Sequence, residues 1–225
     1  MIDEKSALLY SKLNNYKYLV DKTERFIRWS LTQIKNPYVA CSFGKDSSVM
    51  LHLVLKFSKD IPIRFATHPE TNILNNYSEI EKWWIDNHQI NLQEIFCEGG
   101  LVKVKHHQRI MLNEGEWDSF FVGIRAEESV ARRMTLSRFG KFHKLKNGRI
   151  KISPMAWWTE KEIGVYMIAN KLPFLNDYKF SGISTRTSSG VPRTMIHESL
   201  QQLKNRDILA FNKLCELFED AKYYV

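Results

Sequence analysis

Residues 38–55 read YVACSFGKDSSVMLHLVL, an apolar run followed by a short polar turn and a second apolar run. The first run predicts a strand, and the apolar residues after the turn recur at helical spacing, which predicts a helix. The turn between them contains small residues, one glycine and one lysine. Unpaired backbone N–H groups at a helix start, together with the helix dipole, favour a negatively charged ligand. The stretch therefore predicts a strand, a phosphate-binding loop and a helix.

The loop does not follow the usual nucleotide-binding pattern G-x-x-x-x-G-K-[ST]. Val39 stands where the first glycine belongs, and Asp46 follows Lys45 where serine or threonine belongs. What remains is S-F-G-K-D-S, which resembles the S-G-G-K-D-S loop of the PP-loop ATP pyrophosphatases, enzymes that cleave ATP between its α- and β-phosphates. The phenylalanine form is most similar to the branch that contains PAPS reductases and the small subunit of bacterial ATP sulfurylase. An ordinary strand-to-helix turn, capped by Asp46 or Ser47, is the alternative.

The composition fits one α/β domain of 225 residues, of which 44% are hydrophobic. No run approaches the roughly 18 consecutive apolar residues of a transmembrane helix, and the first residues do not resemble a signal peptide. The three cysteines, Cys41, Cys97 and Cys215, lie far apart without a C-x-x-C motif. That spacing predicts a reducing, cytoplasmic location and no cysteine-ligated zinc or iron–sulfur cluster.

The net charge of +8 is concentrated in two segments. No acidic residue stands between Glu128 and Glu160, and none stands between Asp177 and Glu198. The basic residues of the two segments are Arg132, Arg133, Arg138, Lys141, Lys144, Lys146, Arg149 and Lys151, and then Lys179, Arg186 and Arg193. Such segments predict an anionic ligand, a nucleic acid or a partner protein at one face, centred on residues 132–151. A solvated basic loop is the alternative.

Apolar patterns alternate between the periods of strands and helices along the chain. Further strands are expected at 61–67, 92–97, 117–123 and 149–154, and helices at 3–30, 74–87, 101–112, 160–170 and 198–219. The alternation predicts a doubly wound, mainly parallel α/β sheet with helices on both faces. We expect an N-terminal helical segment at 1–36, a nucleotide-binding domain at 37–178, and a C-terminal extension with a basic loop and a helix at 179–225.

A second motif follows the strand expected before residue 124. It resembles the G-x-R-x-x-E-x-x-x-R segment of the sulfurylase and reductase branch. The matching residues are Gly123, Arg125, Glu128 and Arg132, with Arg133 one place further. An arginine at the carboxyl end of a strand offers a bidentate fork to a phosphate, and ligands of open parallel sheets bind at that edge. A surface ion pair between Glu128 and Arg132 on the next helix is the alternative.

Two further segments resemble the same family. The segment THPET is similar to the family's D-T-G-x-x-x-P-E-T region, although Ala66 or Thr67 replaces the aspartate. The resemblance implies that Thr67 and His68 contact the adenosine. The segment WWTEKEI is similar to the family's P-L-x-x-W-T-x-x-D-I-W region, and its spacing predicts a capping box between Thr159 and Glu162.

The C-terminal tail departs from the family pattern. Many relatives carry G-x-x-R-x-G-C-x-x-C, whose cysteines hold an iron–sulfur cluster or act in redox chemistry, but Ser188 and Ser189 occupy that region here. PAPS reductases also carry a catalytic cysteine in an E-C-G-L-H context near the C-terminus. Cys215 lies instead in the apolar helical pattern NKLCEL, which predicts a core position.

The resemblance implies an enzyme that cleaves ATP, or a related adenine sulfonucleotide (PAPS or APS), at the α-phosphate. The reaction would be adenylyl transfer or pyrophosphate release, in sulfur or nucleic-acid modification. Lys45, Asp46 and Arg125 are the expected catalytic residues, and Asp46 either places Mg²⁺ or caps the helix. The other expected nucleotide-binding residues are Ser42, Phe43, Gly44, Ser47, Ser48, Thr67, His68, Gly123, Arg132 and Arg133. Arg186 and Arg193 are expected to bind a second, anionic substrate. A thiol-dependent sulfonucleotide reductase and a non-catalytic nucleotide- or nucleic-acid-binding module are the alternatives.

Overall fold

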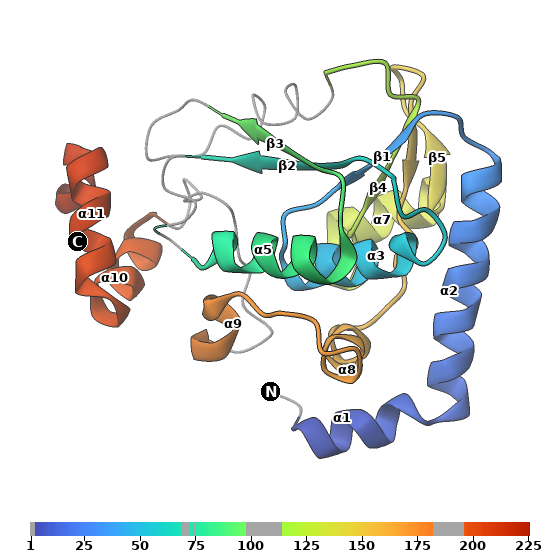
Figure 1. The fold of residues 1–225 in the computed structure, drawn as a ribbon, viewed down its shortest axis with the longest axis horizontal. Coiled ribbons are helices and arrows are strands. Elements are labelled where there is room, and N and C mark those ends of the chain that lie inside the picture. The colour runs from blue at the N-terminus through green and yellow to red at the C-terminus, as the bar shows by residue number, and fades with distance from the viewer. Residues whose placement is uncertain (1–2, 69–72, 74, 98–113, 182–195) are drawn as a thin grey trace.

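Figure 1 shows the computed structural model, which describes residues 3–68, 73, 75–97, 114–181 and 196–225. Its strands are β1 (Pro37–Ala40), β2 (Ile63–Thr67), β3 (Leu92–Phe96), β4 (Ser119–Val122), β5 (Phe142–Lys144) and β6 (Ile150–Ile152). They form a six-stranded sheet in the order β3-β2-β1-β4-β6-β5. Every neighbouring pair is parallel except β5 and β6, which are antiparallel. The mainly parallel α/β fold expected from the sequence is confirmed.

Three helices pack beneath the sheet in the view of Figure 1: α3 (Lys45–Leu55), α5 (Tyr77–His88) and α8 (Glu160–Ala169). Their apolar side chains and those of the central strands form one cluster, in which Trp84 and Val49 are fully buried. Trp84, on the apolar face of α5, is thus a core residue. The capping box at the start of α8 is also confirmed, since Thr159 and Glu162 bond to each other's backbone amides.

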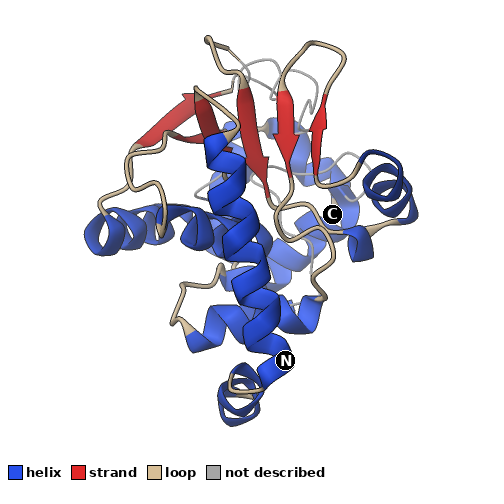
Figure 2. Cartoon of the chain, turned by 90° about the vertical axis from the view of Figure 1, so that its right-hand side faces the viewer, coloured by secondary structure: helices blue, strands red, loops and turns tan. Residues whose placement is uncertain are grey.

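The remaining elements surround this central layer. They are α1 (Glu4–Ser11), α2 (Asn14–Thr32), the short 3₁₀ helix η1 (Ala126–Glu128), α7 (Val130–Phe139), α9 (Asn176–Ser181), α10 (Ile196–Arg206), α11 (Ile208–Leu217) and the 3₁₀ helix η3 (Glu219–Tyr224). In Figure 2, α2 stands in front of the other helices. It reaches the sheet edge at β5, where the rings of Trp29 and Phe142 lie 5.0 Å apart.

The sequence pattern predicted one helix over 3–30, and this prediction is wrong. α1 ends in a C-cap at Lys12, and Leu13 has an extended backbone before α2 begins. The break lets α1 turn away from α2 and pack on α8. Periodicity misses such a break because the apolar spacing resumes within one turn.

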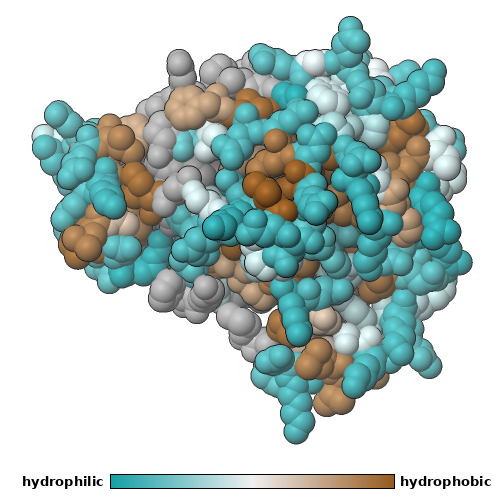
Figure 3. Space-filling view, in the orientation of Figure 1, coloured by the Kyte–Doolittle hydropathy of each residue, from teal (hydrophilic) through white to brown (hydrophobic). Residues whose placement is uncertain are grey.

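The helix expected over 198–219 is also divided. The Asp207 carboxylate accepts a hydrogen bond from the Ala210 amide and so begins a new helix, α11, directly after α10. α10, α11 and η3 bury a small apolar cluster of their own. Hydrophilic residues cover most of the face in Figure 3, with apolar residues gathered over these C-terminal helices, where Leu209 is 70% exposed.

The helix expected over 101–112 lies outside the described residues. None of the helices in the described part of the chain has the length and apolar character that crossing a bilayer requires.

Candidate functional site

The loop between β1 and α3 is held in one conformation by its own side chains. Phe43 has a φ of 50°, which is uncommon for a residue with a side chain. Its buried ring packs edge-on against Phe65, with ring centroids 5.0 Å apart. The Ser48 hydroxyl, also buried, donates to the Phe43 carbonyl at 3.2 Å. The side chains of Phe43 and Ser48 therefore fix the loop in this conformation.

Two other serines shape the mouth of the loop. The Ser47 hydroxyl donates to the Gly44 carbonyl at 3.0 Å and accepts a hydrogen bond from the Ser42 amide at 3.3 Å. Ser42 is exposed, and its hydroxyl lies 3.2 Å from that of Ser47. The amides of the first turn of α3 carry the positive end of the helix dipole. A phosphate entering the loop would meet these amides and the Ser42 hydroxyl together.

Gly123 lets β4 approach the start of α3 closely. A Cβ at this position would lie 2.8 Å from the Asp46 carbonyl carbon and 2.8 Å from the Ser47 amide nitrogen. Both distances are well below normal van der Waals contact, about 3.5 Å. Any residue other than glycine would therefore displace the first turn of α3. The glycine of the second sequence motif thus packs against the loop of the first.

Arg125 lies just beyond β4 and is 2% exposed. Its Nε donates to an Asp46 carboxylate oxygen, and its Nη1 donates to Glu127 at 2.6 Å and to the Trp158 carbonyl at 3.3 Å. On the other side of Asp46, the second carboxylate oxygen lies 3.4 Å from Lys45 Nζ. The two motifs thus meet in a cluster in which the cations Arg125 and Lys45 are buried, Asp46 is partly buried and Glu127 is exposed.

The charges of this cluster stabilise one another. Burial alone lowers the pKa of the Arg125 guanidinium, but the carboxylates of Asp46 and Glu127 reverse that effect and raise its pKa. Arg125 therefore stays positively charged in a site from which water is largely excluded. A cation held there interacts more strongly with a phosphate than the same cation would in water.

Asp46, which was expected either to place Mg²⁺ or to cap the helix, has both carboxylate oxygens facing cations, Arg125 and Lys45. Within the described residues there is no group of three or more metal-ligating side chains. The contacts of Asp46 suit the orientation of Arg125, and its role toward Mg²⁺ stays a prediction.

Tyr178 of α9 belongs to this site and was not predicted from the sequence. Its hydroxyl accepts a hydrogen bond from the Lys45 amide at 3.1 Å, and Lys45 Nζ lies 5.4 Å from the centre of its ring. The tyrosine thus occupies one of the first-turn amides that a phosphate would use. Next to it, Asp177 forms an ion pair with Arg206 of α10. The sequence carries no signal for this contact, because the partners are 133 residues apart.

The other predicted site residues have different surroundings. Thr67 ends β2 and His68, which is buried, follows it, so both stand at the carboxyl edge of the sheet beside β1. Arg132 forms a surface ion pair with Glu128, the alternative anticipated from the sequence. Arg132 is tied to the cluster only through Glu128, which also accepts a hydrogen bond from the Arg125 amide at 2.7 Å.

Arg133 is exposed on α7. Arg186 and Arg193, together with Ser188 and Ser189, lie outside the described residues. No structural statement therefore applies to the expected second-substrate site.

Burial disfavours the thiolate at two of the three cysteines. It raises the pKa of the Cys41 thiol to about 12, although Cys41 lies at the start of the phosphate loop. Cys215 packs against the cluster of the C-terminal helices, where burial raises its pKa, and Cys97 is buried. Thiolates with lowered pKa values are the reactive ones, so neither Cys41 nor Cys215 has the environment of a nucleophile in this conformation.

Comparison with known proteins agrees with the geometry. Residues 36–182 match the family model described as the phosphoadenosine phosphosulfate (PAPS) reductase domain. The chain is 31% identical to a PAPS reductase of Xylella fastidiosa (strain 9a5c) in an alignment 176 residues long, which covers 67% of this chain and 71% of that protein. It is 28% identical to a PAPS reductase of Buchnera aphidicola subsp. Acyrthosiphon pisum (strain 5A) over 223 residues, covering 87% and 88% of the two chains. The chain belongs to the PAPS reductase domain family.

Solved structures share the fold at low sequence identity. A PAPS reductase from Candida auris, in complex with phosphate, aligns with a TM-score of 0.52 at 16% identity, over 81% of this chain and 93% of that one. An FMN adenylyltransferase from Candida glabrata, in complex with FAD and inorganic pyrophosphate, aligns with a TM-score of 0.56 at 12% identity, over 79% and 66%. The resemblance inferred from the loop, to the PAPS reductase branch, is confirmed by the family model, and these structures share the fold.

Proposed function

We propose that the loop and the charged cluster bind an adenine nucleotide, and that the reaction breaks the bond between its α-phosphate and the next anionic group. The observation that carries this proposal is the position of Arg125. It is 2% exposed, remains charged beside Asp46 and Glu127, and lies next to the first turn of α3. A buried cation beside a helix N-terminus, at the carboxyl edge of a parallel sheet, suits a chain of phosphate or sulfate groups.

The residues of the cluster have separate roles in this proposal. The first-turn amides of α3 and the Ser42 hydroxyl hold the outer anionic group. Lys45 neutralises the charge that develops on the leaving group. Arg125, fixed by Asp46, binds the α-phosphate. Catalysis then rests on positioning and on charges placed in advance, which avoids reorganising solvent during the reaction.

The relatives support reduction of an adenine sulfonucleotide as the first candidate reaction, because the similar proteins of Xylella fastidiosa and Buchnera aphidicola are PAPS reductases. In a thiol-dependent reduction, a thiolate attacks the sulfur and the S–O bond to the α-phosphate breaks. The nucleotide leaves with the bridging oxygen, and a second thiol then releases sulfite as a disulfide forms. Cys215 is the partly exposed cysteine of the three, so it is the candidate nucleophile. This role requires that Cys215 leave its packed position.

ATP cleavage at the α-phosphate, with pyrophosphate release or adenylyl transfer, is the second candidate. The surroundings of the cysteines favour it, since the pKa values of Cys41 and Cys215 are both raised by burial. Such a reaction needs no protein thiol and uses the same Lys45 and Arg125. A non-catalytic nucleotide-binding module is the third candidate. It is favoured by the ion pairs within the cluster, in which Arg125 pairs with Asp46 and Glu127, and Lys45 pairs with Asp46.

One set of assays separates the three candidates. The purified chain is given PAPS with thioredoxin and its reductant, and sulfite is measured; separately it is given ATP with Mg²⁺, and pyrophosphate is measured. Sulfite that disappears in Cys215→Ser supports the reductase. Pyrophosphate that disappears in Lys45→Ala but persists in Cys215→Ser supports ATP cleavage. Lys56→Ala is the matched control, because Lys56 caps the far end of the same helix and pairs with Glu24.

Nucleotide binding measured by calorimetry completes the design. Binding that Lys45→Ala weakens, without either product, supports the non-catalytic module. If the wild-type chain binds neither nucleotide, or if Lys45→Ala and Lys56→Ala bind equally well, the proposed site is refuted.

A further inference from the structure

α7 is an unusually exposed helix. Leu136 is its one buried residue, and it packs in a small cluster with Ala126 and Ala156. Val130 is 69% exposed, Met134 67% and Phe139 51%. A helix on the surface of a globular protein normally hides an apolar stripe against the core. α7 instead presents apolar side chains to solvent, which is typical of a surface that binds something.

The same helix and the hairpin that follows it carry unpaired positive charge. Arg138, Lys144 and Lys146 are exposed. Among the described residues no carboxylate forms an ion pair with them. The sequence between Glu128 and Glu160 contains no acidic residue that could do so locally. An anionic partner therefore gains attraction here without displacing an existing ion pair.

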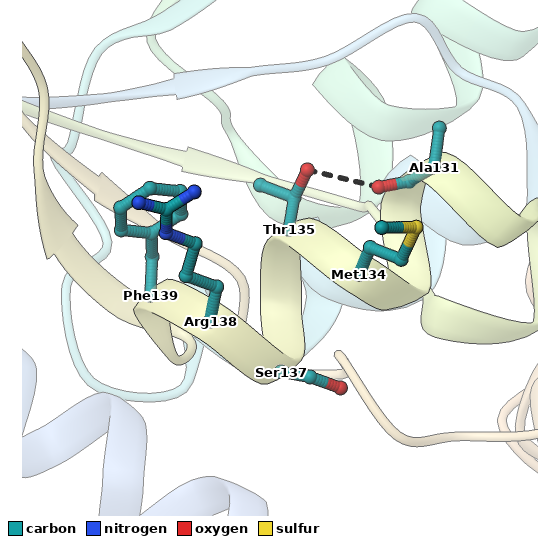
Figure 4. A pocket seen from close by; sticks show the side chains of 6 residues that line it. All are labelled: Ala131, Met134, Thr135, Ser137, Arg138 and Phe139. Atoms are coloured by element: carbon teal, nitrogen blue, oxygen red, sulfur yellow. Dashed lines mark hydrogen bonds between the residues drawn. The ribbon is translucent and has the colours of Figure 1, made fainter.

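Aromatic rings lie within this charged surface. The Phe139 and His143 rings stack with centroids 5.6 Å apart and an angle of 26° between their planes. Arg138 covers Phe139, with its guanidinium carbon 5.1 Å from the ring centre. Figure 4 shows the Arg138 and Phe139 side chains side by side at one end of a shallow hollow along α7. Its lining residues are Ala131, Met134, Thr135, Ser137, Arg138 and Phe139.

We propose that this surface binds single-stranded nucleic acid. It is called the basic face below and consists of Arg138, Phe139, His143, Lys144 and Lys146. Proteins that bind single strands combine positive charge along the backbone with aromatic rings on which bases stack. Phe139, which is 51% exposed, supplies the ring on which a base stacks when it displaces the Arg138 side chain. Arg138, Lys144 and Lys146 then supply the phosphate contacts. An acidic protein segment would use the charges but has no flat rings to match the stacked pair.

The basic face adjoins the candidate nucleotide site in the chain. η1 carries the backbone from Arg125 directly into α7, and Glu128 of η1 bonds to the Arg125 amide and pairs with Arg132 of α7. α7 is ten residues, about 15 Å, long, so a strand that runs from the basic face along the whole helix would reach the end that adjoins η1 and Arg125. Binding to the basic face is independent of which reaction the nucleotide site performs, so the two proposals are tested separately.

The first test measures the salt dependence of binding. Fluorescence anisotropy of labelled oligo(U) and oligo(dT), each about 20 nucleotides long so that it exceeds the usual site size, is followed across a series of salt concentrations. The triple variant Arg138→Gln/Lys144→Gln/Lys146→Gln removes three phosphate contacts. The slope of log K against log salt should fall by about 2, and Kd at about 0.1 M salt should rise on the order of 100-fold.

A second triple variant is the matched control. Lys12→Gln/Lys82→Gln/Lys213→Gln removes three exposed lysines, from the C-cap of α1, from α5 and from α11. Both variants lower the net charge of +8 by three, to +5. If the two triple variants weaken binding equally, net charge and not the basic face explains the affinity, and the proposal is overturned.

The second test concerns stacking. Phe139→Leu keeps an apolar side chain but removes the ring, and should raise Kd about tenfold, while Phe139→Tyr should bind as the wild type does. A duplex of the same length should bind more weakly than the single strand. Base stacking is refuted if the duplex binds as tightly as the single strand and the Phe139→Leu variant binds the single strand as tightly as the wild type does. Unlabelled poly-glutamate of equal charge is compared with unlabelled oligonucleotide as a competitor. If the two displace the labelled oligonucleotide equally well, nucleic acid is refuted as the preferred partner of the basic face.

Discussion

Gly123→Ala tests directly whether the two sequence motifs form one site. The added Cβ would lie 2.8 Å from the Asp46 carbonyl carbon and the Ser47 amide nitrogen. Restoring a normal contact of about 3.5 Å requires a shift of about 0.7 Å. Both neighbouring atoms belong to backbone, so a side-chain rotation cannot absorb that shift. The first turn of α3 must move relative to β4.

The expected cost has two components. Overpacking of this kind lowers the free energy of unfolding by about 1–3 kcal/mol. The displaced amides also lose hydrogen bonds to a charged phosphate, each of which contributes about 1.5–3 kcal/mol, so the Kd for an adenine nucleotide should rise by at least about tenfold. Urea denaturation measures the first quantity, and calorimetric titration with ATP and PAPS measures the second.

Gly140→Ala is the control for this variant. Gly140 has a φ of 73°, and no atom lies within 4 Å of an added Cβ. With a ψ of −174° Gly140 lies in a region that is essentially restricted to glycine. The substitution should therefore cost about 1–3 kcal/mol of stability, through backbone strain alone, and leave nucleotide affinity unchanged. If Gly123→Ala binds nucleotide as tightly as Gly140→Ala does, the first turn of α3 is not the phosphate site and the reasoning fails.

Three further predictions concern single side chains. Tyr178→Phe frees the Lys45 amide, so calorimetry should show adenine nucleotides binding about 2- to 10-fold more tightly; weaker binding would mean that the hydroxyl contacts the ligand. Arg125→Lys loses the fork that reaches two carboxylates and a carbonyl, and should lower the free energy of unfolding by about 1.5–3 kcal/mol, whereas the surface variant Arg132→Lys should change it by less than about 0.5 kcal/mol. His52 has its pKa lowered from 6.5 to about 4 by burial and then by nearby Lys56 and His88. The unfolded chain therefore takes up the proton first, and stability should fall as pH drops from about 6.5 to 4; urea denaturation at both ends of that range should show a smaller loss in His52→Gln, and an equal loss would exclude His52 as the cause.

The sequence determined the parts of this protein that depend on local order. Three features could be predicted from the sequence because each is set by neighbours a few residues away. They are the loop SFGKDS, the glycine and arginine after β4, and the capping box at Thr159. The alternation of strand and helix periods likewise predicted the mainly parallel sheet. Parallel strands place their carboxyl ends at one edge, so the approach of the two motifs followed from topology.

Only the tertiary structure decided which groups touch. Lys45 and Asp46 were expected to face a nucleotide and a metal, but Asp46 is held by Arg125 from another strand, and the Lys45 amide by Tyr178. Neither contact has a sequence signal, since the partners are 79 and 133 residues apart and no period or motif links them. The close approach at Gly123 and the solvent exposure of α7 also depend on how the elements pack. The residue types and their order gave the chemistry available to the loop, and long-range packing decided which of those groups pair with one another and which face solvent.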